Sequence, residues 1–272
     1  MPLQAILFDW SGTLSHDLDV VLKTQNEQFI AIGALPRALE EQDKFYAERG
    51  QRQMVGAQEI TKQFYQSEME LPYMKWYSRF TDCPKERIDK IFFEIYTRNA
   101  HETSIIPGAE NVLQYLKINC IKSLVLSASQ QPHIEKEIAR YNLEGLFDEV
   151  KGSCYDKRDD IKELMNKHGL IPYKTIFIGD MVHDVETALH AGIISVAVSH
   201  PKSSYTIKEK LLKANPHYII EDIKSLIPLA ELLRQWPISE LMPHQTYEER
   251  PIMIENETNF KSLAARLRRS VR

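Results

Sequence analysis

The sequence contains few cysteines, and they lie far apart. Its 272 residues include only Cys83, Cys120 and Cys154, whose spacing matches neither a CxxC motif nor a zinc site. An odd and sparse set of cysteines favours the reduced thiols of a cytoplasmic protein over a disulfide framework.

The sequence also lacks long hydrophobic runs and a strong charge of either sign. No window approaches the roughly 18 uninterrupted apolar residues of a membrane-spanning helix. The opening stretch MPLQAILFDW has no basic leader of the kind that starts a signal peptide. The formal net charge of −4 gives no drive toward nucleic acid or a membrane surface. We therefore expect a soluble, cytoplasmic protein that binds neither nucleic acid nor a membrane.

The chain opens with an apolar strand pattern and then changes to helical spacing. Residues 3–8, LQAILF, end at Asp9 and precede a turn at Gly12 and Thr13, which predicts a buried strand that delivers a carboxylate to a loop. Between residues 18 and 102, apolar residues recur three and four positions apart, as in PKERIDKIFFEIYTRN, so helices dominate. The aromatic stretch PYMKWYSRF in this region is interpreted as helical core and not as a ligand site.

After residue 103, strand and helix patterns alternate. The predicted strands are KSLVLSAS, LFDEV, KTIFIGD, IISVAV and HYII. Such alternation predicts a parallel sheet with helices on both faces. The expected fold is thus α/β, with a Rossmann-like core of residues 1–17 and 103–236 and an inserted all-helical cap domain of residues 18–102.

Two parts of the chain lie outside this core pattern. The insertion of residues 18–102 leaves directly after the first strand and would cover the carboxyl edge of the sheet, where ligands of such sheets bind. Residues 237–272 form a C-terminal extension that is acidic at first and basic at its end. For this extension a solvated or disordered end is favoured over a docked amphipathic helix.

Polar side chains follow the ends of successive predicted strands: Asp9, Ser127, Lys157, and Asp180 with Asp184. A carboxylate such as Asp9 can attack phosphorus in line and form an aspartyl-phosphate. The ammonium of Lys157, the hydroxyl of Ser127 and backbone N–H groups such as that of Ala128 would offset the phosphoryl charge. Arg158 or Lys162 could take the place of Lys157, and Ser129 that of Ser127.

The same strand ends offer oxygen ligands of the kind that Mg²⁺ prefers. Asp9 and Asp180 could bind the ion directly, with the backbone carbonyl of Ser11 as a third protein oxygen. Asp184 could hold a metal-bound water, orient Lys157, or cap the helix that follows it.

In this order, FDWSGTL, LVLSAS, Lys157 and GDMVHD resemble the haloacid dehalogenase-like superfamily of phosphotransferases, over residues 1 to about 236. The helical insertion resembles the first type of cap in that superfamily. The resemblance implies that Asp9 is the nucleophile, that Ser127 and Lys157 bind phosphate, and that Asp180 and Asp184 serve Mg²⁺.

Ser11 departs from the pattern of the superfamily. Its phosphatases usually carry DxDGT, whose second aspartate protonates the leaving group and then activates water. Proton transfer of this kind contributes about 10²–10⁴-fold to a rate, and a serine hydroxyl, with a pKa far above neutrality, replaces it poorly. We therefore expect Ser11, as the residue at a catalytic position, to make turnover slow on esters with poor leaving groups.

The leading hypothesis is a Mg²⁺-dependent phosphatase of a small phosphorylated metabolite. A phosphate-binding or regulatory protein with little turnover remains open. So does a C–P hydrolase similar to phosphonoacetaldehyde hydrolase, for which Lys44 or Lys62 would form a Schiff base. Within the cap, Arg49 and Arg52 are candidate ligands for a substrate anion, with a solvated turn as the alternative. His16 is a candidate substitute acid or base, with an exposed loop histidine as the alternative.

Overall fold

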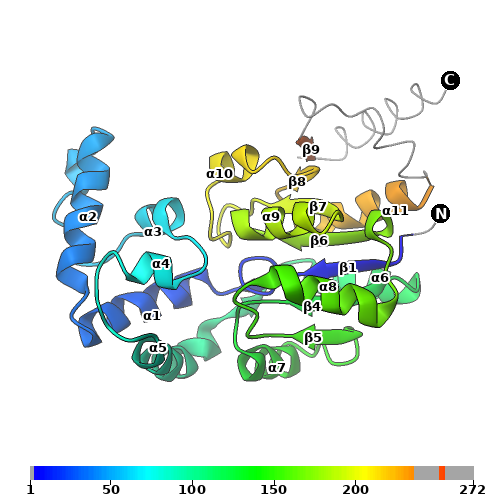
Figure 1. Cartoon of the computed structure of the whole chain (residues 1–272), viewed down its shortest axis with the longest axis horizontal. Coiled ribbons are helices and arrows are strands. Elements are labelled where there is room, and N and C mark those ends of the chain that lie inside the picture. The colour runs from blue at the N-terminus through cyan, green and yellow to red at the C-terminus, as the bar shows by residue number, and fades with distance from the viewer. Residues whose placement is uncertain (1–2, 236–250, 255–272) are drawn as a thin grey trace. The chain divides into compact units, whose positions relative to one another are not determined.

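The computed structural model describes residues 3–235 and 251–254. The chain divides into two compact units, an α/β unit that ends at Ser15 and resumes at Ile105, and a helical unit of residues His16–Ser104 (Figure 1). Among the described residues, no helix combines the length and the apolar character that a membrane crossing requires.

The α/β unit is built on one parallel sheet with the strand order β5-β4-β1-β6-β7-β8-β9. Its strands are β1 Ala5–Phe8, β4 Lys122–Leu126, β5 Glu149–Lys151, β6 Thr175–Gly179, β7 Ile194–Val198, β8 Tyr218–Ile220 and β9 Ile252–Ile254. Because β1 lies between β4 and β6, the residue that follows β1 lies between the two loops that leave those neighbouring strands.

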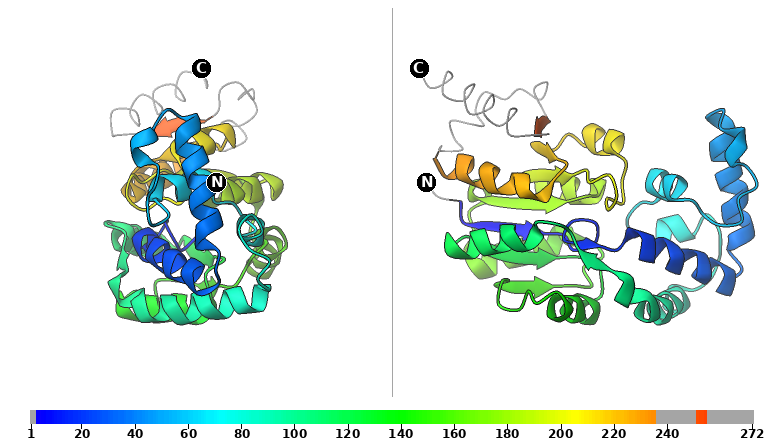
Figure 2. Two further views of the ribbon diagram at one scale, coloured as in Figure 1. Left: turned by 90° about the vertical axis from the view of Figure 1, so that its left-hand side faces the viewer. Right: turned by 180° about the vertical axis from the view of Figure 1, so that it is seen from behind.

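Alternation along the strands divides the core of the sheet between its two faces. Ile6 and Phe8 pack on one face, and Ala5 and Leu7 pack on the other, as the two-residue period of a strand requires. The first face is covered by α6 Ala109–Ile118, α7 Gln131–Arg140 and α11 Leu226–Gln235. The second is covered by α8 Lys157–His168, α9 Val182–His190 and α10 Lys208–Lys213. This is the expected Rossmann-like arrangement, and Figure 2 shows α11 in orange alongside the strands.

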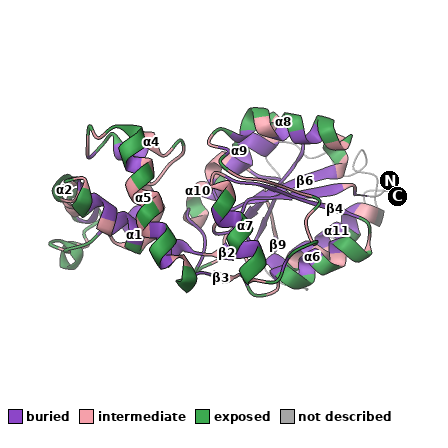
Figure 3. Ribbon diagram, turned by 90° about the horizontal axis from the view of Figure 1, so that it is seen from below, coloured by how far each residue is buried: buried purple, intermediate pink, exposed green. Residues whose placement is uncertain are grey.

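Burial follows this layering. The four residues of β1 and the five of β6 are all buried, and each helix turns an apolar side toward the sheet. Figure 3 shows the buried residues along the strands and on the inner sides of the helices of this unit, with exposed residues on the outer sides. A parallel sheet covered on both faces needs such continuous apolar strands.

Two details differ from the sequence expectations. The strand expected at LFDEV begins only at Glu149; one residue earlier, the Ser123 backbone N–H donates to the Asp148 carboxylate and not to a backbone carbonyl. The solvated end expected for residues 237–272 is wrong for Ile252–Ile254, which pairs with β8 as the last strand of the sheet. The basic segment near the C-terminus, FKSLAARLRRSVR, lies outside the described residues.

The helical unit contains α1 Leu18–Ala31, α2 Leu35–Glu48, α3 Lys62–Glu68, α4 Met74–Tyr77 and α5 Lys85–Asn99. Its core is aromatic: Trp76 and Phe80 are buried and in contact, and the Phe29 ring packs against Phe80. The stretch PYMKWYSRF therefore supplies helical core, as the sequence indicates. Two short strands, β2 Ser15–His16 and β3 Ser104–Ile105, form a separate two-stranded sheet where the chain passes between the units.

Candidate active site

Asp9 lies at the carboxyl end of the central strand. It directly follows β1, its backbone N–H donates to the Ile178 carbonyl at 2.9 Å, and its side chain is buried. Ser127 directly follows β4 and Asp180 directly follows β6. Since both strands pair with β1 in parallel register, three polar side chains that are far apart in sequence meet at one edge of the sheet.

Lys157 brings two of the carboxylates together. Its ammonium donates to Asp9 Oδ1 at 2.8 Å and to Asp184 Oδ1 at 2.7 Å. The lysine side chain is only 1% exposed, and it comes from the first residue of α8. Arg158 and Lys162, the other candidates for this role, are exposed, and Arg158 pairs with Asp156.

Burial and these neighbours shift the ionisation of both partners. Burial raises the pKa of the Asp9 carboxyl and Asp184 raises it further, while Lys157 and the Ser127 hydroxyl lower it; the net direction is upward. Burial alone would lower the pKa of Lys157, but the carboxylates of Asp184 and Asp9 outweigh it and hold that pKa above its ordinary value. Lys157 is therefore a permanent positive charge beside the candidate nucleophile.

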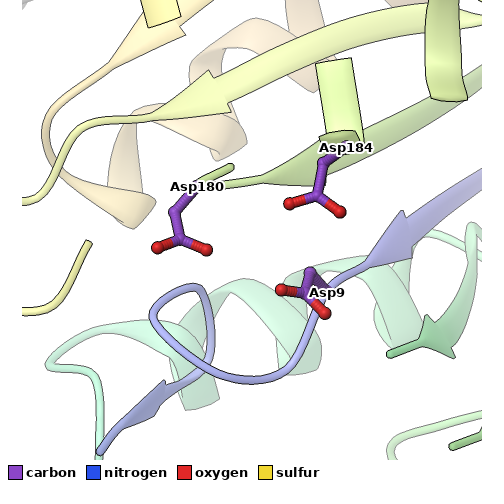
Figure 4. A group of neighbouring side chains, drawn as sticks. All are labelled: Asp9, Asp180 and Asp184. Atoms are coloured by element: carbon purple, nitrogen blue, oxygen red, sulfur yellow. The ribbon is translucent and has the colours of Figure 1, made fainter. Parts of the chain in front are cut away.

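Three buried carboxylates converge on one point. Asp9, Asp180 and Asp184 each offer an oxygen, and these atoms lie within 4.8 Å of one another (Figure 4). When all are ionised, three carboxylates and the Lys157 ammonium leave two negative charges, which a divalent cation would balance. An all-oxygen set of carboxylates suits the hard cation Mg²⁺, so the residues present fit such an ion.

Two glycines make this convergence possible. Gly12 has a φ of +73°, and a Cβ there would lie 2.3 Å from Asp180 Oδ2. A Cβ on Gly179 would lie 2.3 Å from Asp184 Oδ2. The backbone of each glycine therefore occupies the space beside a carboxylate, which explains why Gly follows FDWS and why Gly precedes Asp180.

Asp180 and Asp184 are each held by a backbone donor. The Tyr205 N–H donates to Asp180 Oδ2, and the Met181 N–H donates to Asp184 Oδ2 at 3.1 Å. Met181 is the N-cap of α9 and Asp184 is its third residue, so Asp184 caps the helix through the N–H of Met181 without being the N-cap itself. The structure thus corrects the N-cap position considered for Asp184, which caps α9 from its third residue while it contacts Lys157; its role toward a metal ion stays a prediction.

The loop after β4 separates the two candidate serines. Ser127 is 1% exposed, and its hydroxyl lies against Asp9 while accepting the Ser129 N–H at 3.2 Å. The Ser129 hydroxyl instead pairs with that of Ser11 at 2.8 Å. Ala128, between them, is partly buried. Ser127 is therefore the serine beside the nucleophile, and Ser129 is the partner of the residue at the acid–base position.

The predicted cap residues belong to the helical unit. Arg49 is exposed, its guanidinium lies 3.6 Å from the centre of the Phe45 ring, and it donates to the Phe45 carbonyl. Arg52 begins a short 3-10 helix and is exposed. Their contact with a substrate anion stays a prediction, as does the acid–base role considered for His16.

Three features of the site have no clear signal in the sequence. They are the Tyr205 N–H beside Asp180, the pairing of Ser129 with Ser11, and the buried His183. The His183 Nε2 atom is buried without a hydrogen-bond partner among the described residues, and burial, with the nearby Lys157, lowers its pKa. The only sequence signal for His183 is its place directly before Asp184. Tyr205 lies in a loop with no motif of its own.

Known proteins are similar to this chain over most of its length. Residues 6–198 match the family model of the haloacid dehalogenase-like hydrolases. The chain is 23% identical over 236 residues to the phosphoglycolate phosphatase of Synechococcus elongatus, covering 86% of this chain and all of that protein. It is 24% identical over 229 residues to the phosphoglycolate phosphatase of Mannheimia succiniciproducens, covering 82% of this chain and 96% of that protein.

A solved structure with the same fold is a haloacid dehalogenase-like family hydrolase from Streptococcus pneumoniae. It superposes with a TM-score of 0.61 at 20% identity, covering 84% of this chain and 98% of that one. With the family model matching most of the chain, the protein belongs to the haloacid dehalogenase-like hydrolases.

Proposed function

We propose that the protein is a Mg²⁺-dependent phosphatase that removes the phosphoryl group of a small phosphorylated metabolite through an aspartyl-phosphate on Asp9. The observation that carries the proposal is the buried cluster in which Lys157 joins Asp9 to Asp184, with Asp180 within reach. The phosphoglycolate phosphatases among the relatives support a small phosphorylated acid as the substrate class.

In the first step, a carboxylate oxygen of Asp9 attacks phosphorus and the bond to the leaving-group oxygen breaks. Lys157 and the Ser127 hydroxyl stand beside Asp9, where they would offset the charge of the phosphoryl oxygens. In the second step, water attacks the phosphorus of the aspartyl-phosphate, which releases phosphate and restores the carboxylate.

Asp9, Asp180 and Asp184 would hold Mg²⁺, with the Ser11 carbonyl as a further oxygen. Such an ion supplies positive charge that shields the carboxylate from the phosphoryl oxygens. The cluster has a surplus of negative charge without it, so the three aspartates and Lys157 are the residues on which the Mg²⁺ requirement depends.

Ser11 determines which leaving groups suit this site. Its hydroxyl is hydrogen-bonded to that of Ser129, and neither hydroxyl protonates a leaving group near neutral pH. We therefore propose that turnover is slow on alkyl phosphates and faster where the leaving oxygen departs without a proton, as in an aryl or acyl phosphate.

The second candidate, a phosphate-binding protein with little turnover, is favoured by the same Ser11–Ser129 pair. A C–P hydrolase of the Schiff-base type gains less support. The Glu41 carboxylate bonded to Lys44 raises the pKa of that lysine, and Lys62 is paired with Asp19 at 3.0 Å, whereas a Schiff-base lysine must lose its proton.

The test compares the wild type with Asp9→Asn on a panel of aryl, acyl and alkyl phosphates, with and without Mg²⁺. Asp159→Asn is the matched control, because Asp159 is an exposed aspartate on α8. We expect Mg²⁺-dependent hydrolysis by the wild type and by Asp159→Asn, and none by Asp9→Asn. Stoichiometric binding of the phosphates without hydrolysis would favour the second candidate instead.

A further inference from the structure

Glu137 is a buried carboxylate outside the aspartate cluster. It lies on α7 and is 4% exposed. Taking a charged group out of water is costly unless hydrogen bonds compensate for it, so the partners of Glu137 indicate what it does.

Those partners are the two ends of the loop that follows Asp9. Glu137 Oε2 accepts the indole N–H of Trp10 at 2.6 Å and the hydroxyl of Ser15 at 3.1 Å. Its other oxygen faces the Arg140 guanidinium at 3.7 Å. The Trp10 ring is fixed in addition by stacking on Tyr141, with ring centres 6.4 Å apart.

One oxygen atom thus joins both ends of the turn. The backbone closes the same turn, because the N–H groups of Leu14 and Ser15 donate to the Trp10 carbonyl. Between these ends lie Ser11, whose carbonyl is a candidate metal ligand, and Gly12, whose backbone lies against Asp180. Asp9 immediately precedes Trp10. A shift of Trp10 would therefore displace the groups that meet the substrate and the ion.

We propose that Glu137 is a positioning residue that holds the loop of residues 10–15 in the conformation needed for phosphoryl transfer at Asp9. It acts through Trp10 and Ser15 and touches no reacting atom. This inference rests on the proposed function for its kinetic consequences. Its effect on cation binding can be measured apart from turnover.

The test replaces Glu137 in two ways. Glu137→Ala removes the acceptor, while Glu137→Gln keeps an acceptor oxygen and nearly the same volume. Glu135→Ala is the control, because Glu135 is exposed on the same helix and its carboxylate accepts the side-chain amide of Gln131 on that helix. Trp10→Phe removes one donor and keeps an aromatic ring, which serves if Glu137→Ala does not fold.

Two readouts are taken at a temperature where every variant is folded: the Mg²⁺ midpoint, which is the free Mg²⁺ concentration at half saturation in a calorimetric titration, and kcat and KM on an aryl phosphate. A misplacement of about 1 Å in such a site costs on the order of a hundredfold in rate. We expect Glu137→Ala to lower kcat about tenfold to a hundredfold with little change in KM and to raise the Mg²⁺ midpoint. Trp10→Phe should shift both in the same direction by less, and Glu137→Gln should restore most of each.

A lower Tm for Glu137→Ala with an unchanged Mg²⁺ midpoint and kcat would overturn the proposal, since Glu137 would then serve stability alone. An equal defect in Glu137→Gln would also overturn it, because the acceptor oxygen would not be the cause. If the wild type hydrolyses no phosphate at all, the proposed function fails, while the Mg²⁺ midpoints still decide the role of Glu137.

Discussion

Replacing Gly12 by alanine tests how closely the first loop fits the metal-binding carboxylates. The new Cβ would lie 2.3 Å from Asp180 Oδ2, 2.7 Å from Asp180 Cγ and 2.9 Å from the Tyr205 ring. Asp180 cannot simply turn away, because its Oδ2 accepts the Tyr205 N–H. The substitution must therefore move the loop, Asp180 or both.

Gly12→Ala lowers the free energy of unfolding for two reasons, and the same substitution at a second glycine measures one of them alone. A residue with a side chain in the left-handed region costs about 1–2 kcal/mol, and forcing an extra methyl into a packed site costs about 1–3 kcal/mol more. Gly169, which ends α8, has a φ of +61°, and a Cβ there would meet nothing within 4 Å. Gly169→Ala thus carries only the first cost, and Gly12→Ala carries both.

Urea unfolding of the metal-free variants measures the loss of unfolding free energy in each, and the rise in Tm on adding Mg²⁺ reports whether the aspartate cluster still binds the ion. We expect Gly12→Ala to lose about 2–5 kcal/mol of unfolding free energy, more than Gly169→Ala, and to lose most of the Mg²⁺-induced rise in Tm. Gly169→Ala should keep that rise. The close approach of Gly12 to Asp180 would have no consequence if the two variants lost the same unfolding free energy and both kept the full Mg²⁺-induced rise in Tm.

Three further predictions follow from the charges and burial of the site. The pKa of Asp9 is higher in the folded protein than its ordinary value of 3.8. Between these two pKa values the folded state binds more protons than the unfolded state does. The free energy of unfolding therefore falls by about 1.4 kcal/mol for each pH unit by which the pH rises through this interval. Metal-free Asp9→Asn should therefore gain stability relative to the wild type from about pH 4 upward, as thermal unfolding in EDTA measures; a difference independent of pH would contradict this. Ser11→Asp should raise kcat on alkyl phosphates about 10²-fold or more and far less on aryl phosphates, and equal effects on both would argue against an acid–base role at this position. Burial raises the pKa of the Cys154 thiol to about 12, while Cys120 is exposed. Iodoacetamide should therefore label Cys120 before Cys154 in the native protein, which peptide mass spectrometry measures. Equal labelling of the two cysteines would contradict the burial of Cys154.

The strand ends of the core could be predicted from sequence because a parallel sheet brings them together by rule. Short apolar runs locate β1, β4 and β6, and polar residues directly after them must meet at one edge. Asp9 and Asp180 could be placed at this edge from the pattern alone, whereas only the structure shows that Ser127, and not Ser129, lies beside Asp9. Lys157 was harder to assign, since Arg158 and Lys162 lie close by, and only the structure shows which of them is buried against Asp9.

Contacts between distant residues could not be predicted in this way. Glu137 is one of two acidic residues on α7, and no pattern in that helix indicates that it contacts Trp10, 127 positions earlier. Ile252–Ile254 is too short for a strand signal and is a strand only because the edge of β8 pairs with it. The hydroxyl pair of Ser11 and Ser129 depends likewise on the packing of two loops.

The most direct test of the proposed function is whether Asp9 becomes phosphorylated during turnover. The wild type and Asp9→Asn are mixed with an aryl or acyl phosphate and Mg²⁺, quenched in acid within one turnover, and mapped by peptide mass spectrometry. We expect one phosphoryl group on the peptide that contains Asp9 in the wild type and none in Asp9→Asn. Full turnover by Asp9→Asn, or phosphorylation of a different residue during turnover, would contradict it.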